Sequence, residues 1–225
     1  MAAAAPQLLE SDRPGSRTTR EAVLDAAERL FAERGFEATS LNDVGAAAGV
    51  SRGTPGYFFG SKAELYHAVL EHAFADALEA IRAGRLRAMR SARPPAEVLA
   101  GVVSDYVDFV AAHPNFLRLI QREALGEGAG LDPRSLRQAV GSEAVTALAQ
   151  ELGFPPRART QVMHLLLSML ALTWFPALHD TTLVPAIGFD RPSPAFLAAR
   201  KRHITTLLLG ALPSRRATPS KRSAR

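Results

Sequence analysis

The stretch of sequence that decides the fold is residues 39–62, TSLNDVGAAAGVSRGTPGYFFGSK. Leu41, Val44 and Ala48 recur at helical spacing, so the first half of this stretch predicts a helix of about two turns with one apolar face. Gly49 follows the last apolar position, where a chain that leaves a helix often needs a positive φ. The second half opens with small and polar residues and continues into an aromatic run, which predicts a second short helix. Two short helices joined by a tight turn are typical of a helix-turn-helix unit, whose second helix enters the major groove of DNA.

The proline at position 55 indicates where the second helix begins. A proline four residues after a Ser51 cap would delete the first hydrogen bond of the helix, because its nitrogen carries no proton. A helix capped by Thr54 places Pro55 at its first position, where no bond is lost. We therefore expect the regular helix to start at Pro55, after an irregular or 3₁₀ lead-in over residues 51–54. Gly56, which has no side chain, would then let the backbone lie close to a base or a phosphate.

Three pairs of residues have the spacing of a capping box, in which a serine or threonine caps a helix and an acid three residues later bonds back to it. The pairs are Thr18 with Glu21, Ser40 with Asp43, and Ser61 with Glu64. They predict helix starts before, within and after the helix-turn-helix unit. The last of these starts opens an apolar pattern that runs from Lys62 to about Met89. We expect this long helix to connect two domains.

Taken together with residues 33–36 and 61–65 on either side, the quoted stretch resembles the N-terminal domain of the TetR family of transcriptional regulators. The resemblance covers residues 17–66 and holds many positions in register: Phe36, Thr39, Ser40, Asp43, 48–51, Gly53, Thr54, 57–59 and 61–65. Pro55 and Gly56 depart from it, because the family usually has Leu-Tyr at these positions. The resemblance implies a homodimer that binds a near-palindromic operator, and a C-terminal domain that binds a small-molecule effector.

The resemblance also implies which residues contact DNA. Thr39, Ser40, Asn42, Tyr57 and Lys62 are expected at phosphates and Arg52 and Thr54 at base edges, while Ser51, Gly53 and Gly56 belong to the same surface. Arg17 and Arg20, at the start of the first helix, are further candidates for contact with the DNA backbone. Phe58 stands where the family often has a hydrogen-bonding tyrosine or histidine, so we expect a phosphate contact to be lost there. Residues 49–62 contain basic residues and no acid, which makes this surface locally positive.

The rest of the chain predicts an all-α protein with no internal repeat. Residues 1–16 lack periodicity and residues 213–225 form a basic tail without an apolar pattern, so we expect both segments to be disordered. Between them we expect a DNA-binding domain over 17–66 and a helical ligand-binding and dimerisation domain over 67–212. Prolines that suit the first turn of a helix precede apolar patterns in the second domain. They predict helices near 95–112, 114–125, 133–152, 156–178 and 194–212, with a loop over 181–192.

Composition excludes fewer classes of protein than these motifs do. The 225 residues carry a net charge of +5, but the basic residues of the tail account for all of it, so the rest of the chain is neutral. The absence of cysteine excludes disulfides and thiolate metal sites and fits a reducing compartment. The N-terminal residues lack the pattern of a signal peptide, and the longest apolar run, 163–178, falls short of a membrane span of about 20 residues. We therefore expect a cytoplasmic protein with no membrane partner.

No catalytic or metal-binding motif is visible in the sequence. The chain lacks HExxH, P-loop, nucleophile-elbow and paired-carboxylate patterns, and no two of its histidines have the spacing of a helical metal pair. We expect neither an enzyme nor a bound cofactor. A protein of a different class, an all-helical small-molecule sensor or carrier that has lost specific DNA binding, stays open because of Pro55 and Gly56. The intact polar positions of the second helix argue against it.

Two stripes of apolar and aromatic side chains in the second domain are candidates for an effector site. The candidate residues are Tyr106, Phe109, His113, Phe116, Met163, His164, Leu167 and Trp174. Tyrosine and tryptophan carry polar tips that need partners, and methionine adapts to varied shapes. Since no charged residue lies within the stripes, we expect an apolar or weakly polar effector. Ordinary core is the alternative for each of these residues.

Residues 162–178 and 204–212 are apolar on most sides, which is more than the surface of a monomer favours. The resemblance implies that these last two helices form a four-helix interface with the same helices of a second copy. Burial of both helices within one subunit is the alternative. A glutamate at Leu165 or Leu208 is expected to give either a monomer or a protein that does not fold. The residues do not identify the effector, the operator, the sign of regulation or any role of the tail on DNA.

Overall fold

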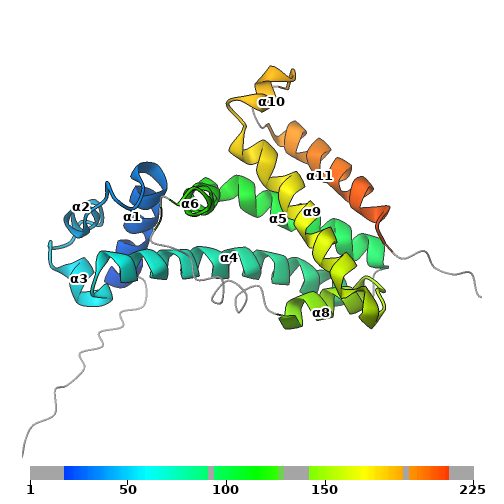
Figure 1. Cartoon of the computed structure of the whole chain (residues 1–225), viewed down its shortest axis with the longest axis horizontal. Coiled ribbons are helices and arrows are strands. Elements are labelled where there is room, and N and C mark those ends of the chain that lie inside the picture. The colour runs from blue at the N-terminus through cyan, green and yellow to red at the C-terminus, as the bar shows by residue number, and fades with distance from the viewer. Residues whose placement is uncertain (1–17, 91–93, 127, 129–141, 190–192, 213–225) are drawn as a thin grey trace, which may run out of the picture.

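The computed structural model describes residues 18–90, 94–126, 128, 142–189 and 193–212. Throughout these residues the regular elements are helices and no strand is present, so the expected all-α fold is confirmed (Figure 1). The terminal segments 1–16 and 213–225, Arg17, and the start of the helix expected over 133–152 lie outside the described residues. The helices are α1 (Thr19–Arg34), α2 (Leu41–Ala47), α3 (Thr54–Phe59), α4 (Lys62–Arg90), α5 (Pro95–Ala112), α6 (Pro114–Ala124), α8 (Ser142–Glu151), the 3₁₀ turn η1 (Pro156–Ala158), α9 (Arg159–Leu178), α10 (Leu183–Ala186) and α11 (Pro194–Leu209).

The three expected capping boxes are all present and set the starts of α1, α2 and α4. The Ser61 amide donates to Glu64 Oε2 at 2.8 Å, and the Glu64 amide donates back to Ser61 Oγ at 3.2 Å. Because the Ser61 side chain and backbone bond to the charged carboxylate, the pKa of Glu64 is lowered. Each box satisfies amide groups that have no partner inside their helix. The same reciprocal pairs join Thr18 with Glu21 and Ser40 with Asp43.

The later helices agree with the expected ranges in most places. α5 has the expected bounds, and α6 ends one residue before the expected end. α9 begins after the single 3₁₀ turn η1, whose first residue is a proline as expected. α11 ends at Leu209, before Gly210, so the helix expected to reach 212 is shorter than the sequence indicates. The short helix α10 lies in the segment that we expected to be a loop.

Two hydrophobic cores share helix α4. The first core lies among α1, α2, α3 and the start of α4, and it includes Phe31, Val44 and Leu65. The second core lies among α5, α6, α9 and α11 and includes Ala73 and Ala77 from the middle of α4. A residue of α6, Leu119, is fully buried in the first core. The first domain is therefore held both by the continuous helix α4 and by the packing of α6 on α1.

The helices form an elongated molecule with α4 along one side (Figure 1). The helix-turn-helix unit lies at one end of α4, α8 lies near the other end, and α9 and α11 run side by side beyond α5. One helix of the described residues, Pro156–Leu178, is long and apolar enough by length and composition to cross a membrane, with a mean hydropathy of 1.5. This helix packs on α5, α6, α8 and α11, yet only 22% of its apolar span is buried within the chain. Much of its apolar surface therefore has no partner inside one subunit.

Candidate nucleic-acid interface and cavity

The turn between α2 and α3 is closed by backbone hydrogen bonds and two glycines. Gly49 adopts a φ of 70°, as expected for the residue that follows α2. The Val50 amide donates to the Gly45 carbonyl at 2.9 Å and brings the chain back over α2. A Cβ at Gly45 would lie 3.1 Å from the Ser51 carbonyl oxygen, closer than most side chains allow. Gly45 is a structural residue of the unit that the sequence analysis missed, although an isolated glycine in a helical pattern is a signal of close packing.

The second helix of the unit begins late, as Pro55 predicts. The Thr54 amide donates to the Ser51 carbonyl at 3.0 Å, a bond three residues back, and the first bond four residues back runs from Tyr57 to Gly53 at 2.9 Å. The irregular lead-in over 51–54 is thus confirmed, and α3 starts one residue before the expected position. The expected cap is wrong: Gly53 occupies the cap position and makes no side-chain bond. The Thr54 hydroxyl instead shares a 2.7 Å hydrogen bond with the Ser51 hydroxyl.

One face of α3 holds the helix in place and the other is exposed. Pro55 and Phe59 are buried against the first core, which orients α3. Tyr57 has 85% of its surface exposed, and Phe58, edge-on to its ring at 5.3 Å, is exposed as well. Around these rings lie the other exposed or half-exposed residues expected at DNA: Ser40, Asn42, Ser51, Arg52, Gly53, Thr54 and Gly56. These residues belong to α2 and its cap, the turn and α3, and each has exposed surface there.

Thr39 is the residue for which the expected phosphate contact is wrong. Its side chain is 0% exposed, and its hydroxyl donates to the Gly35 carbonyl at 2.8 Å. The last carbonyls of a helix have no partner inside it, and a buried polar group needs one. Thr39 therefore closes the end of α1 and does not face DNA.

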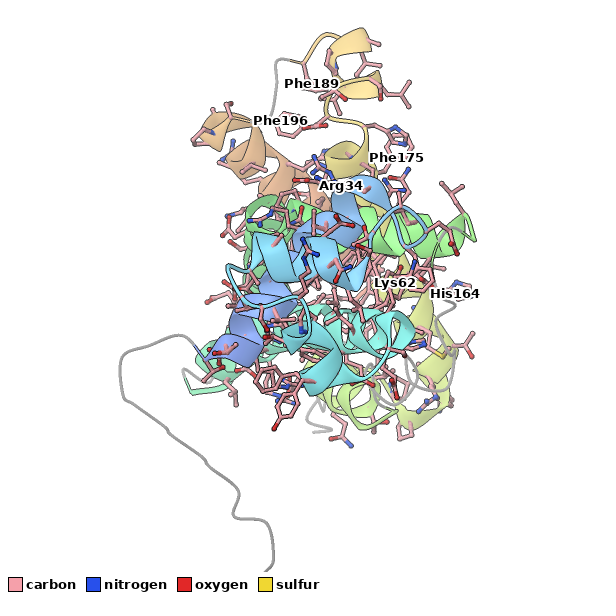
Figure 2. All side chains as sticks on the ribbon, turned by 90° about the vertical axis from the view of Figure 1, so that its left-hand side faces the viewer. Arg34, Lys62, His164, Phe175, Phe189 and Phe196 are labelled. Atoms are coloured by element: carbon pink, nitrogen blue, oxygen red, sulfur yellow. The ribbon has the colours of Figure 1, made fainter. Side chains whose placement is uncertain are left out.

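Lys62 lies in the same region but its amine is engaged within the chain. Its Nζ donates to the Phe36 carbonyl at 2.9 Å and lies 4.2 Å from the centre of the Phe36 ring. Figure 2, which views this end of the molecule, shows Lys62 set back among the helices. This residue ties the start of α4 to the turn after α1, a role that the sequence analysis missed. Arg20, the further basic candidate on α1, is exposed and lies 4.9 Å from the Phe59 ring centre.

The eight residues expected at the effector site include both core residues and exposed ones. Tyr106, Phe109 and Phe116 are buried, and the Trp174 indole N–H donates to the Tyr106 hydroxyl at 2.7 Å. Burial raises the pKa of Tyr106, so its hydroxyl stays protonated. The ring of His113 stacks on Phe109 at 4.3 Å. Tyr106, Phe109, Phe116 and Trp174 belong to the packed core, which is the alternative that the sequence analysis left open, and the polar tips of Tyr106 and Trp174 satisfy each other. His113 is exposed.

The remaining three expected residues, Met163, His164 and Leu167, lie on the outer side of α9. Leu167 is 62% exposed, and Met163 and His164 are exposed too, with His164 at the edge of the molecule in Figure 2. Their assignment to an effector site stays a prediction. α9 is apolar nearly all round, so its sequence pattern does not indicate which side faces the interior.

A cavity of about 460 Å³ lies instead among α5, α6, the end of α9 and the start of α11. Most of its lining residues are apolar, but polar groups form much of the wall, and Arg118, Asp180 and Arg200 place charges there. The lining residues are Val107, Val110, Ala111, Pro114, Leu117, Arg118, Gln121, Thr173, Pro176, Ala177, Leu178, Asp180, Thr181, Phe196, Leu197 and Arg200. None of the eight expected residues is among them. A pocket of this size and composition fits a small organic molecule. No cluster of His, Asp or Glu that could hold a metal ion occurs in the described part of the chain.

A helix-turn-helix unit with an exposed second helix, joined by a long helix to an all-α domain, defines the class of helix-turn-helix transcriptional regulators. Two family models agree with this class. The model for "Bacterial regulatory proteins, tetR family" matches residues 23–69, and the model for "Tetracyclin repressor-like, C-terminal domain" matches residues 95–208. The chain therefore belongs to the TetR family of transcriptional regulators.

Curated relatives include both a transcriptional repressor and a transcriptional activator. The transcriptional repressor NicS of Pseudomonas putida is 29% identical over 130 residues, which cover 58% of this chain and 59% of NicS. The transcriptional activator FasR of Mycolicibacterium smegmatis is 30% identical over 113 residues, 48% of this chain and 50% of FasR. The chain thus spans little more than half the length of these relatives. They are regulators of transcription and not enzymes.

Solved structures resemble the chain over nearly its whole length. A transcriptional regulator from Streptomyces coelicolor has a TM-score of 0.65 at 22% identity, over 87% of this chain and 99% of that one. A TetR-like regulator from Rhodococcus sp. RHA1 has a TM-score of 0.61 at 20% identity, over 88% and 97% of the two chains. At these identities the likeness shows the fold, a helix-turn-helix domain followed by a helical domain.

Proposed function

We propose that the chain is a cytoplasmic, homodimeric repressor that binds a near-palindromic operator and releases it when a small molecule occupies the second domain. The observation that carries DNA binding is the exposed face of α3, where Arg52 and Tyr57 project beside a helix held by buried Pro55 and Phe59. Arg52 reads a base edge, and the exposed hydroxyls and amide around it contact phosphates. Lys62 supports this surface from behind through the Phe36 carbonyl.

The dimer forms through α9 and α11, which lie side by side with apolar residues on their outer surfaces (Figure 1). The exposed apolar residues are Met163, Leu167 and Phe175 on α9 and Leu207 on α11. Several exposed large apolar side chains on two neighbouring helices favour an interaction site there. A second copy of the same two helices would cover it in a symmetric interface. The positions at which a charge should disrupt the dimer are therefore these exposed residues. Leu165 and Leu208 are buried within the subunit, so a charge there should give the unfolded protein, the second of the two expected outcomes.

The effector acts through the 460 Å³ cavity of the second domain. A molecule bound there would favour one arrangement of the two DNA-binding domains over another, so that only one state matches the spacing of the half-sites. Half-sites for a dimer of this class are separated by about 34–36 Å, one turn of DNA. The alternative of a carrier without DNA binding rested on Pro55 and Gly56, and α3 forms with Pro55 buried. The Pro55-Gly56 pair therefore no longer favours a carrier without DNA binding.

A gel-shift experiment tests the DNA-binding function directly. Purified full-length protein is titrated against the DNA upstream of its own gene, with an unrelated fragment of equal length as competitor. We expect a retarded complex that the unrelated fragment does not displace at equal concentration. Arg52→Ala, at an exposed position outside both cores, is the matched control and should weaken this preference. Equal binding of both fragments would favour the carrier.

A further inference from the structure

The proline inside α9 leaves one backbone carbonyl of that helix without its helical partner. In a helix the carbonyl of Leu172 would accept from the amide of residue 176, but Pro176 has no amide hydrogen. Arg200 of α11 takes this place: its Nη2 donates to the Leu172 carbonyl at 2.6 Å and its Nε at 3.2 Å. The guanidinium is thereby held in one orientation at the wall of the cavity.

The positive charge of Arg200 has no counter-ion among the residues that the structure describes. Its side chain is half-buried, and burial lowers its pKa. Asp108 of α5 pairs with the neighbouring Lys201 at 2.6 Å. Both hydrogens of Nη1 and one of Nη2 have no acceptor in the described part of the chain. An anion that binds beside a partly desolvated cation stabilises its charge and accepts from its free donors.

The rest of the cavity complements an apolar body and adds no net charge. Arg118 and Asp180 contribute one charge of each sign, so Arg200 makes the lining positive. Most other lining side chains are hydrocarbon, among them Val107, Leu197 and Phe196. The Thr173 hydroxyl is already engaged, since it donates to the Met169 carbonyl at 2.8 Å. The cavity therefore combines one fixed, unpaired cation with mostly apolar lining residues.

We infer that the cavity binds an amphipathic anion, with an oxyanion headgroup on the free edge of Arg200 and an apolar body against the walls. A guanidinium offers parallel N–H donors that match a carboxylate or a phosphate ester. This inference rests on the proposed function only in that the anion would be the effector. It revises the expectation of an apolar effector, because that expectation was based on stripes of residues that do not line the cavity.

Calorimetry on the full-length protein tests the headgroup with three probes that share one chain: decanoate, decyl phosphate and uncharged 1-decanol. We expect at least one anion to bind about ten- to a hundredfold more tightly than the alcohol, the range of a charge-assisted hydrogen bond. The comparison of decanoate with decyl phosphate distinguishes a carboxylate from a phosphate site. Equal affinity for the alcohol and both anions, or no binding of either anion, overturns the inference.

Variants separate the ligand contact from the structural bond of Arg200. Arg200→Gln alone would leave the Leu172 carbonyl unpaired and could unfold the domain. Pro176→Ala restores an amide hydrogen that the Leu172 carbonyl can accept within α9. In the double variant Pro176→Ala with Arg200→Gln, the cation of α11 is therefore removed without leaving that carbonyl unpaired. We expect Pro176→Ala alone to keep the preference for the anion and the double variant to lose it. Arg202→Gln, an equal charge change at an exposed position on α11 outside the cavity, should have no effect. A double variant that keeps the preference overturns the inference.

A gel shift with the operator separates this inference from the proposed function. If an anion binds in an Arg200-dependent way but leaves operator binding unchanged, the ligand class stands and the effector role in the proposed function fails. If a neutral or cationic molecule releases the operator and neither anion binds, the effector role stands and the assignment of an anionic ligand fails.

Discussion

Arg52 lies on the exposed lead-in to α3, away from both hydrophobic cores. Arg52→Ala should therefore leave the free energy of unfolding nearly unchanged and weaken operator binding by about 1–3 kcal/mol. Because a guanidinium reads a base edge, discrimination at one or two base positions should relax. Competition binding with a set of single-base operator variants measures both effects. A uniform loss across all variants would instead assign Arg52 to a phosphate.

Lys62 differs from Arg52 because its amine is bound within the protein. Lys62→Ala removes the hydrogen bond to the Phe36 carbonyl and the contact with the Phe36 ring. We expect a loss of about 1–3 kcal/mol in the free energy of unfolding, measured by urea denaturation. The phosphate contact stays a prediction for a remaining hydrogen of Nζ, and its loss should reduce the salt dependence of operator binding by about one unit. Unchanged stability would show that the bond to Phe36 contributes nothing.

Gly56 and Gly45 form a matched pair for testing why glycine occurs in this unit. A Cβ at Gly56 would meet only Leu41 Cδ1 at 3.9 Å, so Gly56→Ala should stabilise the protein by about 0.5–1 kcal/mol. If the backbone of α3 approaches DNA here, the same change should weaken operator binding. Gly45→Ala should destabilise the protein, because the Ser51 carbonyl oxygen lies 3.1 Å from the added carbon. Thermal unfolding and a gel shift distinguish the two, and full operator binding by Gly56→Ala would remove the argument from close approach.

At the level of elements, α6 connects the cavity to the helix-turn-helix domain. Leu117 and Gln121 line the cavity, and Arg122 directly follows Gln121 in α6. Arg122 Nε donates to the Ala32 carbonyl at 3.1 Å and Nη2 to the Glu33 carbonyl at 2.9 Å, both at the end of α1. A movement of α6 caused by a bound ligand would therefore reach α1 directly.

Arg122→Ala should weaken this connection. We expect the coupling free energy between ligand and operator to fall by about 0.5–2 kcal/mol, with some loss of stability from the uncapped end of α1. The measurement is the ratio of operator affinities with and without the ligand that releases the operator. Arg29→Ala, at an exposed arginine of α1, is the control and should leave the ratio unchanged. An unchanged ratio in a folded Arg122→Ala protein would contradict a role for α6 as the connection.

The helix ends were predictable where local chemistry sets them. The serine and threonine caps act within four residues, and so does Pro55, so their effects are visible in the sequence. The inward side of α9 was not predictable, because a helix that is apolar all round is oriented only by its neighbours α5 and α11. The bond from Arg200 to the Leu172 carbonyl likewise joins residues on different helices. The aromatic residues of the second domain were found, but whether they line a cavity depends on packing that no local pattern records.

At the scale of the whole molecule, the dimer decides whether the chain can recognise a two-fold operator. One subunit presents one α3, and a second copy related by two-fold symmetry would present the other at a fixed distance. The apolar residues that α9 and α11 leave exposed favour such a copy. Dimerisation should therefore be required for tight operator binding, since one domain alone can occupy only a half-site.

Two substitutions on α9 distinguish an interface residue from a core residue. Leu167 is 62% exposed in one subunit, so Leu167→Glu should fold and sediment as a monomer, because an unpaired charge cannot be buried in the apolar interface. Leu165 is 5% exposed and packs in the second core, so Leu165→Glu should unfold the domain instead. Circular dichroism reports folding and sedimentation velocity reports mass. The folded monomer should bind a half-site weakly and show no gain from the full operator. A wild-type protein that sediments as a monomer at micromolar concentration would falsify the interface on α9 and α11, and the apolar surface would then need another partner.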